Sequence, residues 1–272
     1  MDGIRAGCFQ FEVLPGDTEG NLSRVKAALP EFADRGCRLV VLPEMWSCGF
    51  DYPMLTRMAK RTQGVVDELG ESARRYGTVI VGSLPEADEG FVFNTSYVID
   101  SSGEIAGRYR KIHLFSLHGE DRHFGRGQSS LVCATSVGRL GILICYDLRF
   151  PELARRLALD GAEVLCVSAL WPVTRIEHWS LFLRARAVEN QMFVIGCNGC
   201  GSEGEMQYGG TSAIVSPTGG LLAQAGKRES RILSELEPGE MAAFREHIPC
   251  FSDRFPEAYA LPSSPTKGAM EK

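Results

Sequence analysis

Short apolar runs alternate with amphipathic segments along most of this chain. Runs such as 38–42, 78–84 and 136–144 are rich in Val, Ile and Leu, which is typical of strands with both faces covered. Segments such as 65–76 and 178–190 carry apolar residues at helical spacing. This alternation of buried strands and helices predicts an α/β fold with a mixed sheet.

The same patterns predict elements in the rest of the chain. Further strands are expected over 4–13, 91–100, 104–109, 163–169, 192–197, 211–215, 221–225 and 232–236. A helix is expected over 21–35, where Pro30 predicts a kink or break. The glycine-rich stretch 199–210 lacks the Lys-Ser/Thr of a phosphate-binding loop and is expected to be an ordinary loop. From Glu237 onward the pattern is irregular, and its spaced aromatic residues suggest an arm docked on another surface.

One sequence pattern occurs twice in the chain and bears on the architecture. Residues 34–42 parallel residues 159–167, since each stretch is a helix end, a glycine and a buried strand. This predicts two similar halves, each a helix-flanked sheet, packed on one another. We therefore expect an α/β four-layer αββα sandwich spanning residues 1–260, followed by a disordered tail over 261–272.

Composition narrows the class of protein. The chain has 272 residues, of which 44% are hydrophobic, enough for one large domain. A net charge of −5 without a basic stripe argues against nucleic-acid binding, and no apolar run is long enough to span a membrane. The first residues lack the charged and apolar regions of a signal peptide. Nine cysteines, several inside apolar strands, predict free thiols and a cytoplasmic location.

Cys145 stands at a predicted strand-to-helix junction. An apolar run over 140–144 precedes it, and Pro151 fits the first turn of the helix that follows. A thiol at such a turn projects from the sheet edge beside backbone N–H groups, which favour a thiolate and an oxyanion. For an isolated cysteine, burial as a small apolar side chain is the alternative. Other parts of the chain decide between the two.

Three segments together carry the chemistry. Glu44 follows a buried strand in the run 39–46, Lys111 follows a hairpin strand in 107–115, and Cys145 lies in 141–152. In these motifs, in this order, the sequence resembles the nitrilase superfamily of carbon–nitrogen hydrolases, whose catalytic residues are Glu, Lys and Cys. The resemblance runs from about residue 4 to residue 259 and implies the sandwich fold of that superfamily.

The resemblance also implies a role for each residue. Hydrolysis of an amide needs a nucleophile, a proton shuttle and groups that stabilise an oxyanion. Cys145 is expected to be the nucleophile and Glu44 the general base. Lys111 and the backbone N–H of Tyr146 are expected to hold the oxyanion, and the charge of Lys111 is expected to lower the pKa of Cys145. Glu120 matches a second glutamate of the superfamily that bonds the lysine and positions substrate, although the adjacent Asp121 remains an alternative.

Within the superfamily the chain is most similar to the ω-amidase group. Those enzymes hydrolyse the terminal amide of small 2-oxo dicarboxylic acid monoamides, and the matching stretches are 168–172, 178–179, 184–191, 194–201 and 208–212. Leu170 is a departure, because close relatives often carry Asn there. Trp171 fits a pocket wall, with a core aromatic as the alternative. A small acidic substrate would need a cation at the mouth, and the sequence does not select which arginine.

Other functions remain open. A nitrilase, an N-carbamoyl amide hydrolase and an aliphatic amidase share the same nucleophilic apparatus and differ in the pocket. A non-catalytic interaction protein of the same fold is disfavoured by the intact set of Glu44, Lys111 and Cys145. A papain-like Cys–His hydrolase would need His113 beside Cys145 and an orienting Asn or Asp.

The remaining expectations concern partners and neighbouring residues. The resemblance implies a small-molecule amide substrate, a homodimer or larger assembly, and no metal or organic cofactor. Cys197 and Cys200 have CxxC spacing, but no second pair or histidine cluster accompanies them as in a zinc site. After the nucleophile, Asp147, Arg149 and Glu152 are expected to fix the turn through salt links.

Overall fold

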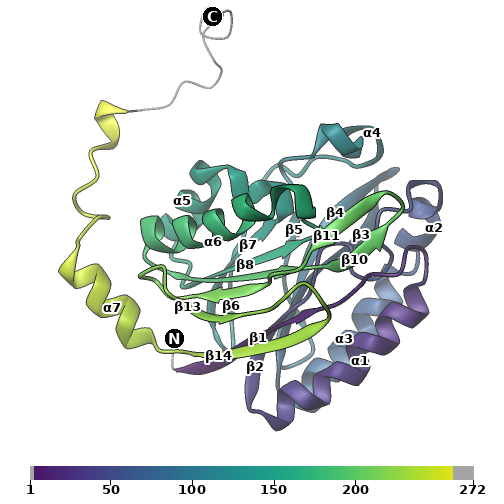
Figure 1. Ribbon diagram of the computed structural model, residues 1–272, viewed down its shortest axis with the longest axis horizontal. Coiled ribbons are helices and arrows are strands. Elements are labelled where there is room, and N and C mark those ends of the chain that lie inside the picture. Colours follow the sequence, from purple (N-terminus) through teal and green to yellow (C-terminus); the bar gives the residue numbers. More distant parts are fainter. Residues whose placement is uncertain (1–2, 260–272) are drawn as a thin grey trace, which may run out of the picture.

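Strands that are apolar on both faces form the centre of the molecule. The computed structural model describes residues 3–259, in which two six-stranded sheets lie face to face between layers of helices (Figure 1). The expected αββα sandwich is therefore confirmed. The tail expected over 261–272 lies outside the described residues.

The first sheet combines N-terminal strands with one strand from near the C-terminus. Its order is β14 (Ser230–Leu236), β1 (Ile4–Gln10), β2 (Cys37–Val41), β3 (Val79–Asp88), β4 (Phe91–Ile99) and β5 (Ile105–Arg110). Strands β1, β2 and β3 are parallel, whereas β14, β4 and β5 join antiparallel to their neighbours.

The second sheet repeats this arrangement. Its order is β6 (Val132–Thr135), β7 (Gly138–Ile144), β8 (Val164–Ala169), β9 (Phe193–Asn198), β12 (Ala213–Val215) and β13 (Leu221–Gln224). Strands β7, β8 and β9 are parallel, and the flanking strands are antiparallel. The two sheets thus match strand for strand, which confirms the two similar halves.

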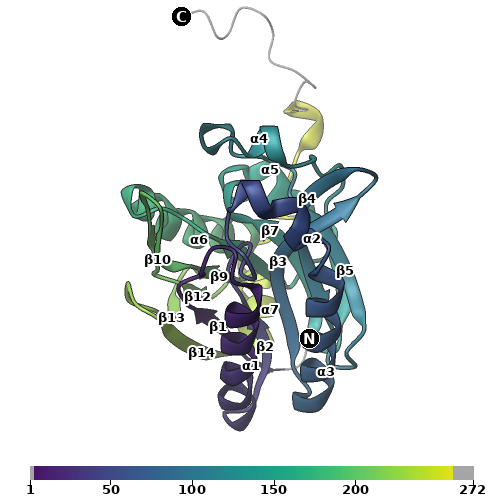
Figure 2. The same cartoon turned by 90° about the vertical axis from the view of Figure 1, so that its right-hand side faces the viewer.

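Helices cover the outer face of each sheet. On the first sheet lie α1 (Thr18–Asp34) and α3 (Thr62–Tyr76), and on the second lie α5 (Pro151–Leu159) and α6 (Ile176–Asn190) (Figure 1). The short helices α2 (Leu55–Ala59) and α4 (Glu120–His123) belong to loops. Figure 2 shows α4 at the upper end of the molecule, with α1 and α3 toward the lower end.

Successive side chains of one strand point to opposite faces of the sheet, so each strand contributes both to the core between the sheets and to the core beneath the helices. In β2, Leu39 and Val41 point to the other sheet, whereas Val40 packs in the core beneath α1 and α3. All three side chains are fully buried. Burying a side chain of this kind contributes about 1.5–3 kcal/mol, which is why these strands are continuous apolar runs rather than alternating ones.

Three sequence-based expectations were wrong. Helix α1 runs through Pro30 without a break, because Leu29 and Phe32 anchor it on the sheet and outweigh the hydrogen bond that proline cannot make. The stretch 199–210 is not an ordinary loop but the hairpin of β10 (Cys200–Glu203) and β11 (Met206–Gly209).

The third error concerns the C-terminal arm, where α7 (Pro238–His247) forms a regular helix. Only Met241 of this helix is buried, so the sequence lacks an apolar stripe that would mark it. Polar contacts attach it instead: Arg245 Nε donates to the carbonyl oxygen of Gln191 at 3.0 Å. Figure 1 shows α7 and the residues after it extending away from the sandwich. No helix within residues 3–259 is long and apolar enough to cross a bilayer.

Helix α5 provides a direct test of the packing beside β7. Leu157 is fully buried against the second sheet, whereas Leu159 on the same helix is 43% exposed. Leu157→Ala should lower the free energy of unfolding by about 2–5 kcal/mol because it leaves a cavity. Leu159→Ala, the matched control, should change it by less than about 0.5 kcal/mol. Urea unfolding followed by circular dichroism measures both, and equal losses would contradict this description of the core.

Candidate active site

Loops from both sheets meet at one end of the sandwich. Glu44 follows β2, Lys111 follows β5, and Cys145 follows β7. Parallel strands bring their carboxyl ends to one edge of a sheet, and the two sheets face each other there. The Glu44 amide N–H donates to the carbonyl oxygen of Ala169 at 3.3 Å, which joins the end of β2 to the end of β8.

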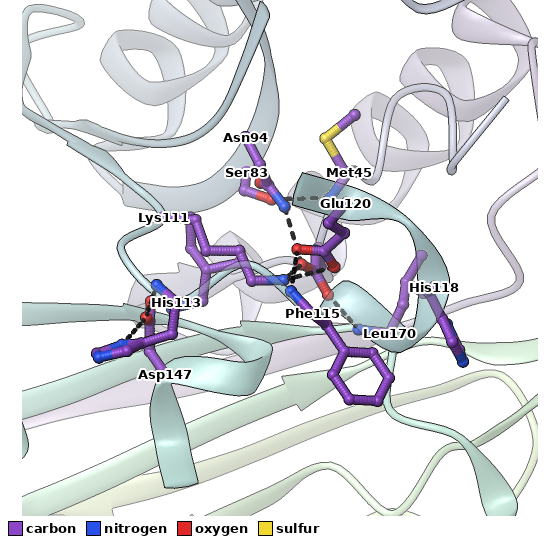
Figure 3. A network of polar contacts seen from close by, with 12 residues as sticks. Met45, Ser83, Asn94, Lys111, His113, Phe115, His118, Glu120, Asp147 and Leu170 are labelled. Atoms are coloured by element: carbon purple, nitrogen blue, oxygen red, sulfur yellow. Dashed lines mark hydrogen bonds and ion pairs between the residues drawn. The ribbon is translucent and has the colours of Figure 1, made fainter. Parts of the chain in front are cut away.

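A buried ammonium group shared by two carboxylates lies at this junction. Lys111 Nζ is 2.7 Å from Glu44 Oε1 and 2.8 Å from Glu120 Oε1 (Figure 3). The lysine side chain has no exposed surface, and the two carboxylates are almost as deeply buried. Buried charges of this kind are stable only when each is paired and hydrogen-bonded. The structure thus brings together Glu44, Lys111 and Glu120, as expected, and Asp121 is exposed.

Both oxygens of Glu44 are held in place. Oε1 also accepts from Asn94 Nδ2 at 2.8 Å, and Oε2 accepts from the backbone N–H of Leu170 at 3.0 Å. Glu120 is held similarly, since its Oε2 accepts from the Phe115 N–H at 3.1 Å. The carboxylates are therefore oriented by groups from three segments of the chain, namely β4, the loop after β5 and the loop after β8.

Cys145 occupies a strained turn. Its φ is 44°, in the left-handed region that non-glycine residues rarely adopt, and it begins the 3₁₀ turn η3 (Cys145–Arg149). Asp147 stabilises this turn, because its Oδ2 accepts from the Ile144 N–H at 3.0 Å and from the Tyr109 hydroxyl at 2.7 Å. Asp147 thus fixes the turn as expected, but through hydrogen bonds to a backbone N–H and a hydroxyl rather than through a salt link.

Burial and the charges of neighbouring residues determine the pKa of the Cys145 thiol. Burial raises the pKa of Cys145 well above its usual range, Glu44 raises it further, and Lys111 opposes this only in part. The charge of Lys111 does lower the pKa of Cys145, as expected, but burial and Glu44 outweigh this effect and the pKa is raised overall. Burial alone would lower the pKa of Lys111, but Glu120 and Glu44 outweigh it and the pKa is raised. Both shifts favour a neutral thiol and a cationic lysine.

A pocket opens onto this cluster. It contains about 440 Å³ of empty space, solvent at its mouth included. Glu44, Glu120 and Cys145 line its reactive end. Its walls are largely aromatic and consist of Phe50, Phe115, Tyr146, Trp171 and Tyr208. Tyr146 and Trp171 thus line the pocket, as does Leu170.

His113 belongs to a different network. Its Nδ1 is 2.7 Å from Asp147 Oδ1, and its ring stacks on Phe150 with centroids 3.5 Å apart. It is absent from the residues that line the pocket, and Figure 3 shows it with Asp147, apart from the lysine cluster. This arrangement disfavours the Cys–His alternative, although Asp147 orients the ring as such chemistry would need.

Sequence reasoning missed several residues of the site. Asn94 carried a usable signal, because a buried amide in the middle of an apolar strand needs a partner. Arg149 and Arg175 both line the pocket. Arg149 was expected to fix the turn through a salt link, but no carboxylate lies within 4.0 Å of it among the residues that the structure describes. Only the fold brings Arg175, thirty residues after Cys145, to the same pocket.

Among residues 3–259 no group of three His, Cys, Asp or Glu side chains could hold a metal ion. Cys197, the first cysteine of the CxxC pair, is fully buried in β9, with its Sγ 3.3 Å from the carbonyl oxygen of Phe9.

Comparisons with known proteins agree with this geometry. The chain is 35% identical to a 2-oxoglutaramate amidase of Bacillus subtilis over 90% of its own length and 95% of that protein, and 31% identical to an omega-amidase of Homo sapiens over 96% and 98%. A carbon–nitrogen hydrolase from Helicobacter pylori has a closely similar structure, with a TM-score of 0.89, 26% identity and coverage of 95% and 97%. The family described as carbon-nitrogen hydrolase matches residues 5–246. The chain therefore belongs to the carbon–nitrogen hydrolase family, which lies within the nitrilase superfamily.

Proposed function

We propose that this protein is an ω-amidase that hydrolyses the terminal amide of a small dicarboxylic acid monoamide through a thioester on Cys145. The observation that carries the proposal is the buried cluster of Glu44, Lys111 and Glu120 at the reactive end of the Cys145 pocket. A glutamate-to-glutamine mutant of a related amidase from Nesterenkonia, with a TM-score of 0.85 and 26% identity over 94% of this chain and 95% of that one, carries the acetamide moiety of fluoroacetamide covalently bound at its active-site cysteine.

Acylation begins with a neutral thiol, so it needs a base. Glu44 takes the thiol proton as the Cys145 sulfur attacks the amide carbon. The carbonyl oxygen becomes an oxyanion held by Lys111 Nζ and the Tyr146 N–H, and one such donor contributes about 3 kcal/mol to the transition state. When the intermediate collapses, the C–N bond breaks and Glu44 returns its proton to the leaving ammonia.

Deacylation repeats these steps with water. Glu44 takes a proton from the water as its oxygen attacks the thioester carbon, and the same two donors hold the second oxyanion. The C–S bond then breaks, the acid product leaves, and Glu44 returns the proton to the Cys145 sulfur. Overall one amide and one water become one carboxylic acid and one ammonia. Glu120 acts by holding Lys111 and does not exchange a proton with the substrate.

The choice of amide rests on the relatives and on the pocket. Relatives named 2-oxoglutaramate amidase or omega-amidase match over most of this chain. Nitriles, N-carbamoyl compounds and simple aliphatic amides are the alternative substrates, because they would use the same nucleophile. An ammonia-release screen across these four classes should show the highest kcat/KM for a monoamide that carries a carboxylate.

We also infer a homodimer and a reducing, cytoplasmic environment. All nine cysteines are free thiols, and seven of them are buried. Helix α6 and strand β13 expose apolar side chains around one groove, including Leu181 at 62% and Leu221 at 48% exposure. Such a patch is typical of a surface that binds another protein, and a second copy of this chain is the proposed partner.

Removing the nucleophile tests the mechanism. Cys145→Ala should lower kcat for amide hydrolysis at least about a thousandfold, because thioester formation is lost, while circular dichroism and the melting temperature remain those of a folded protein. Cys250→Ala is the matched control, since Cys250 is exposed in the C-terminal arm and should be dispensable. Retention of most activity in Cys145→Ala would refute thioester chemistry.

The identity of the base is tested by a second pair of variants. Glu44→Gln removes the proton acceptor and should lower kcat/KM by about 100-fold or more. His113→Ala should lower it less than about tenfold, because His113 contacts Asp147 rather than the pocket. Steady-state ammonia release measures both, with thermal melting as a check on folding. A greater loss in His113→Ala would instead favour Cys–His chemistry.

Light scattering tests the assembly. The expected mass is twice the 29.8 kDa of one chain. The double variant Leu181→Glu with Leu221→Glu should be monomeric, because it puts charge into the apolar groove. Phe91→Glu is the control, as Phe91 is 63% exposed on β4 of the other sheet and should leave the mass unchanged. A fully active wild-type monomer would contradict the dimer.

A further inference from the structure

Two arginines line the Cys145 pocket without an acidic partner. Arg149 comes from the turn η3 that Cys145 begins, and Arg175 ends the turn η4 (Val173–Arg175) after β8. Neither has a carboxylate within 4.0 Å among residues 3–259. Other arginines have a carboxylate partner, as Arg110 has in Glu86 and Arg186 in Glu189.

We propose that Arg149 and Arg175 together form a carboxylate-binding subsite, which selects amides carrying an anionic group at the end remote from the scissile bond. This inference rests on the proposed amidase function and names the residues and the chemical class that would determine its specificity.

Aromatic contacts hold the Arg149 guanidinium. Its Cζ lies 4.8 Å from the centroid of the Trp171 ring and 5.3 Å from that of Phe182. Nη2 is 3.4 Å from Nδ1 of His178, a contact that supplies no negative charge. Stacking engages the faces of a guanidinium and leaves its N–H edge available, which is the geometry that binds a carboxylate through two parallel hydrogen bonds.

Arg175 is placed on the same side of the pocket. Its Cζ lies 5.6 Å from the Phe115 ring centroid. Its carbonyl oxygen accepts from the indole N–H of Trp171 at 2.8 Å, so the backbone of Arg175 and the aromatic partner of Arg149 are tied together. Both guanidinium groups thus lie over aromatic side chains that line the same pocket.

The two positive charges affect each other. Burial lowers the pKa of Arg149 and the neighbouring Arg175 lowers it further, whereas Tyr146 and Cys145 act in the opposite direction. The pKa of His118, which also lines the pocket, is lowered by burial and by Arg175. A bound anion would relieve this repulsion, since an opposite charge stabilises both guanidinium groups.

The opposite end of the pocket has different charges. There Lys111 is shared by Glu44 and Glu120, so a substrate carboxylate placed beside Cys145 would meet two carboxylates and no free cation. Leu170 and Phe115 provide apolar surface for a short methylene chain. This polarity orients a monoamide with its amide at Cys145 and its carboxylate at the arginines, and it disfavours the reverse orientation.

Two substrates of equal length separate this role from a structural one. Glutaramate and pentanamide both have five carbons and one amide, but only glutaramate carries a carboxylate. Arg149→Gln and Arg175→Gln should each lower kcat/KM for glutaramate about 10- to 100-fold, mainly through KM, and change that for pentanamide less than about threefold. Lysine variants should recover part of the loss, because they keep the charge but not the planar fork.

Arg108→Gln is the matched control. Arg108 also stacks on an aromatic ring, with its Cζ 5.5 Å from the Tyr97 centroid, but it is exposed on β5 outside the pocket. Arg108→Gln should leave kcat/KM for both glutaramate and pentanamide unchanged. Equal losses for glutaramate and pentanamide in the Arg149 or Arg175 variants would overturn the subsite.

A binding measurement keeps this inference separate from the amidase proposal. Glutarate should slow alkylation of Cys145 by iodoacetamide in the wild type, and the protection should be lost in Arg149→Gln and Arg175→Gln. Protection without hydrolysis of any amide would support the anion subsite and refute the amidase function. Amide hydrolysis without protection by glutarate, and without preference for glutaramate, would support the amidase function and refute the anion subsite.

Discussion

The ammonium group of Lys111 is the contact on which the site depends. It lies where loops from both sheets meet, and it is buried with two carboxylates that would repel each other without it. Removing one partner of such a cluster leaves an uncompensated buried charge, which costs about 3–5 kcal/mol. The cluster therefore links stability to function: the charges that the proposed reaction uses are also those that hold the loops after β2 and β5 together. Replacing this lysine would affect the position of Glu44 and Glu120 as well as the local charge.

The two matched sheets show how one architecture acquires a single reactive end. Each half supplies three parallel strands with their carboxyl ends at an edge, yet corresponding positions carry different residues. In the first half the loop after β2 supplies Glu44, whereas after the corresponding strand β8 the backbone N–H of Leu170 donates to Glu44. One half thus provides the Glu44 carboxylate, and the other half provides the backbone N–H of Leu170 that orients it. The sandwich repeats its geometry but not its chemistry.

Much of the fold follows from local pattern. The buried strands and the main helices could be predicted because the fold buries the apolar side chains of these elements. Burial leaves a continuous apolar run in a strand covered on both faces, and apolar residues at helical spacing in a helix covered on one. Errors arose where tertiary contacts override local signals. Pro30 is tolerated in α1 because Leu29 and Phe32 anchor that helix, and α7 has almost no apolar face because polar contacts dock it.

The candidate site divides in the same way. Glu44, Lys111 and Cys145 were accessible from their motifs, and the structure brings Glu120 to the lysine as the resemblance implied. The pKa of Cys145 and the place of Arg175 depend on contacts between distant segments, so no reading of local sequence could supply them.

The raised pKa of Cys145 has a consequence outside catalysis. Oxidants and electrophiles attack the thiolate rather than the thiol, and a raised pKa reduces the fraction of thiolate at Cys145 when no substrate is bound. A smaller thiolate fraction slows the reaction of the resting sulfur with peroxide. The burial that raises the pKa thus also helps to preserve the sulfur between turnovers.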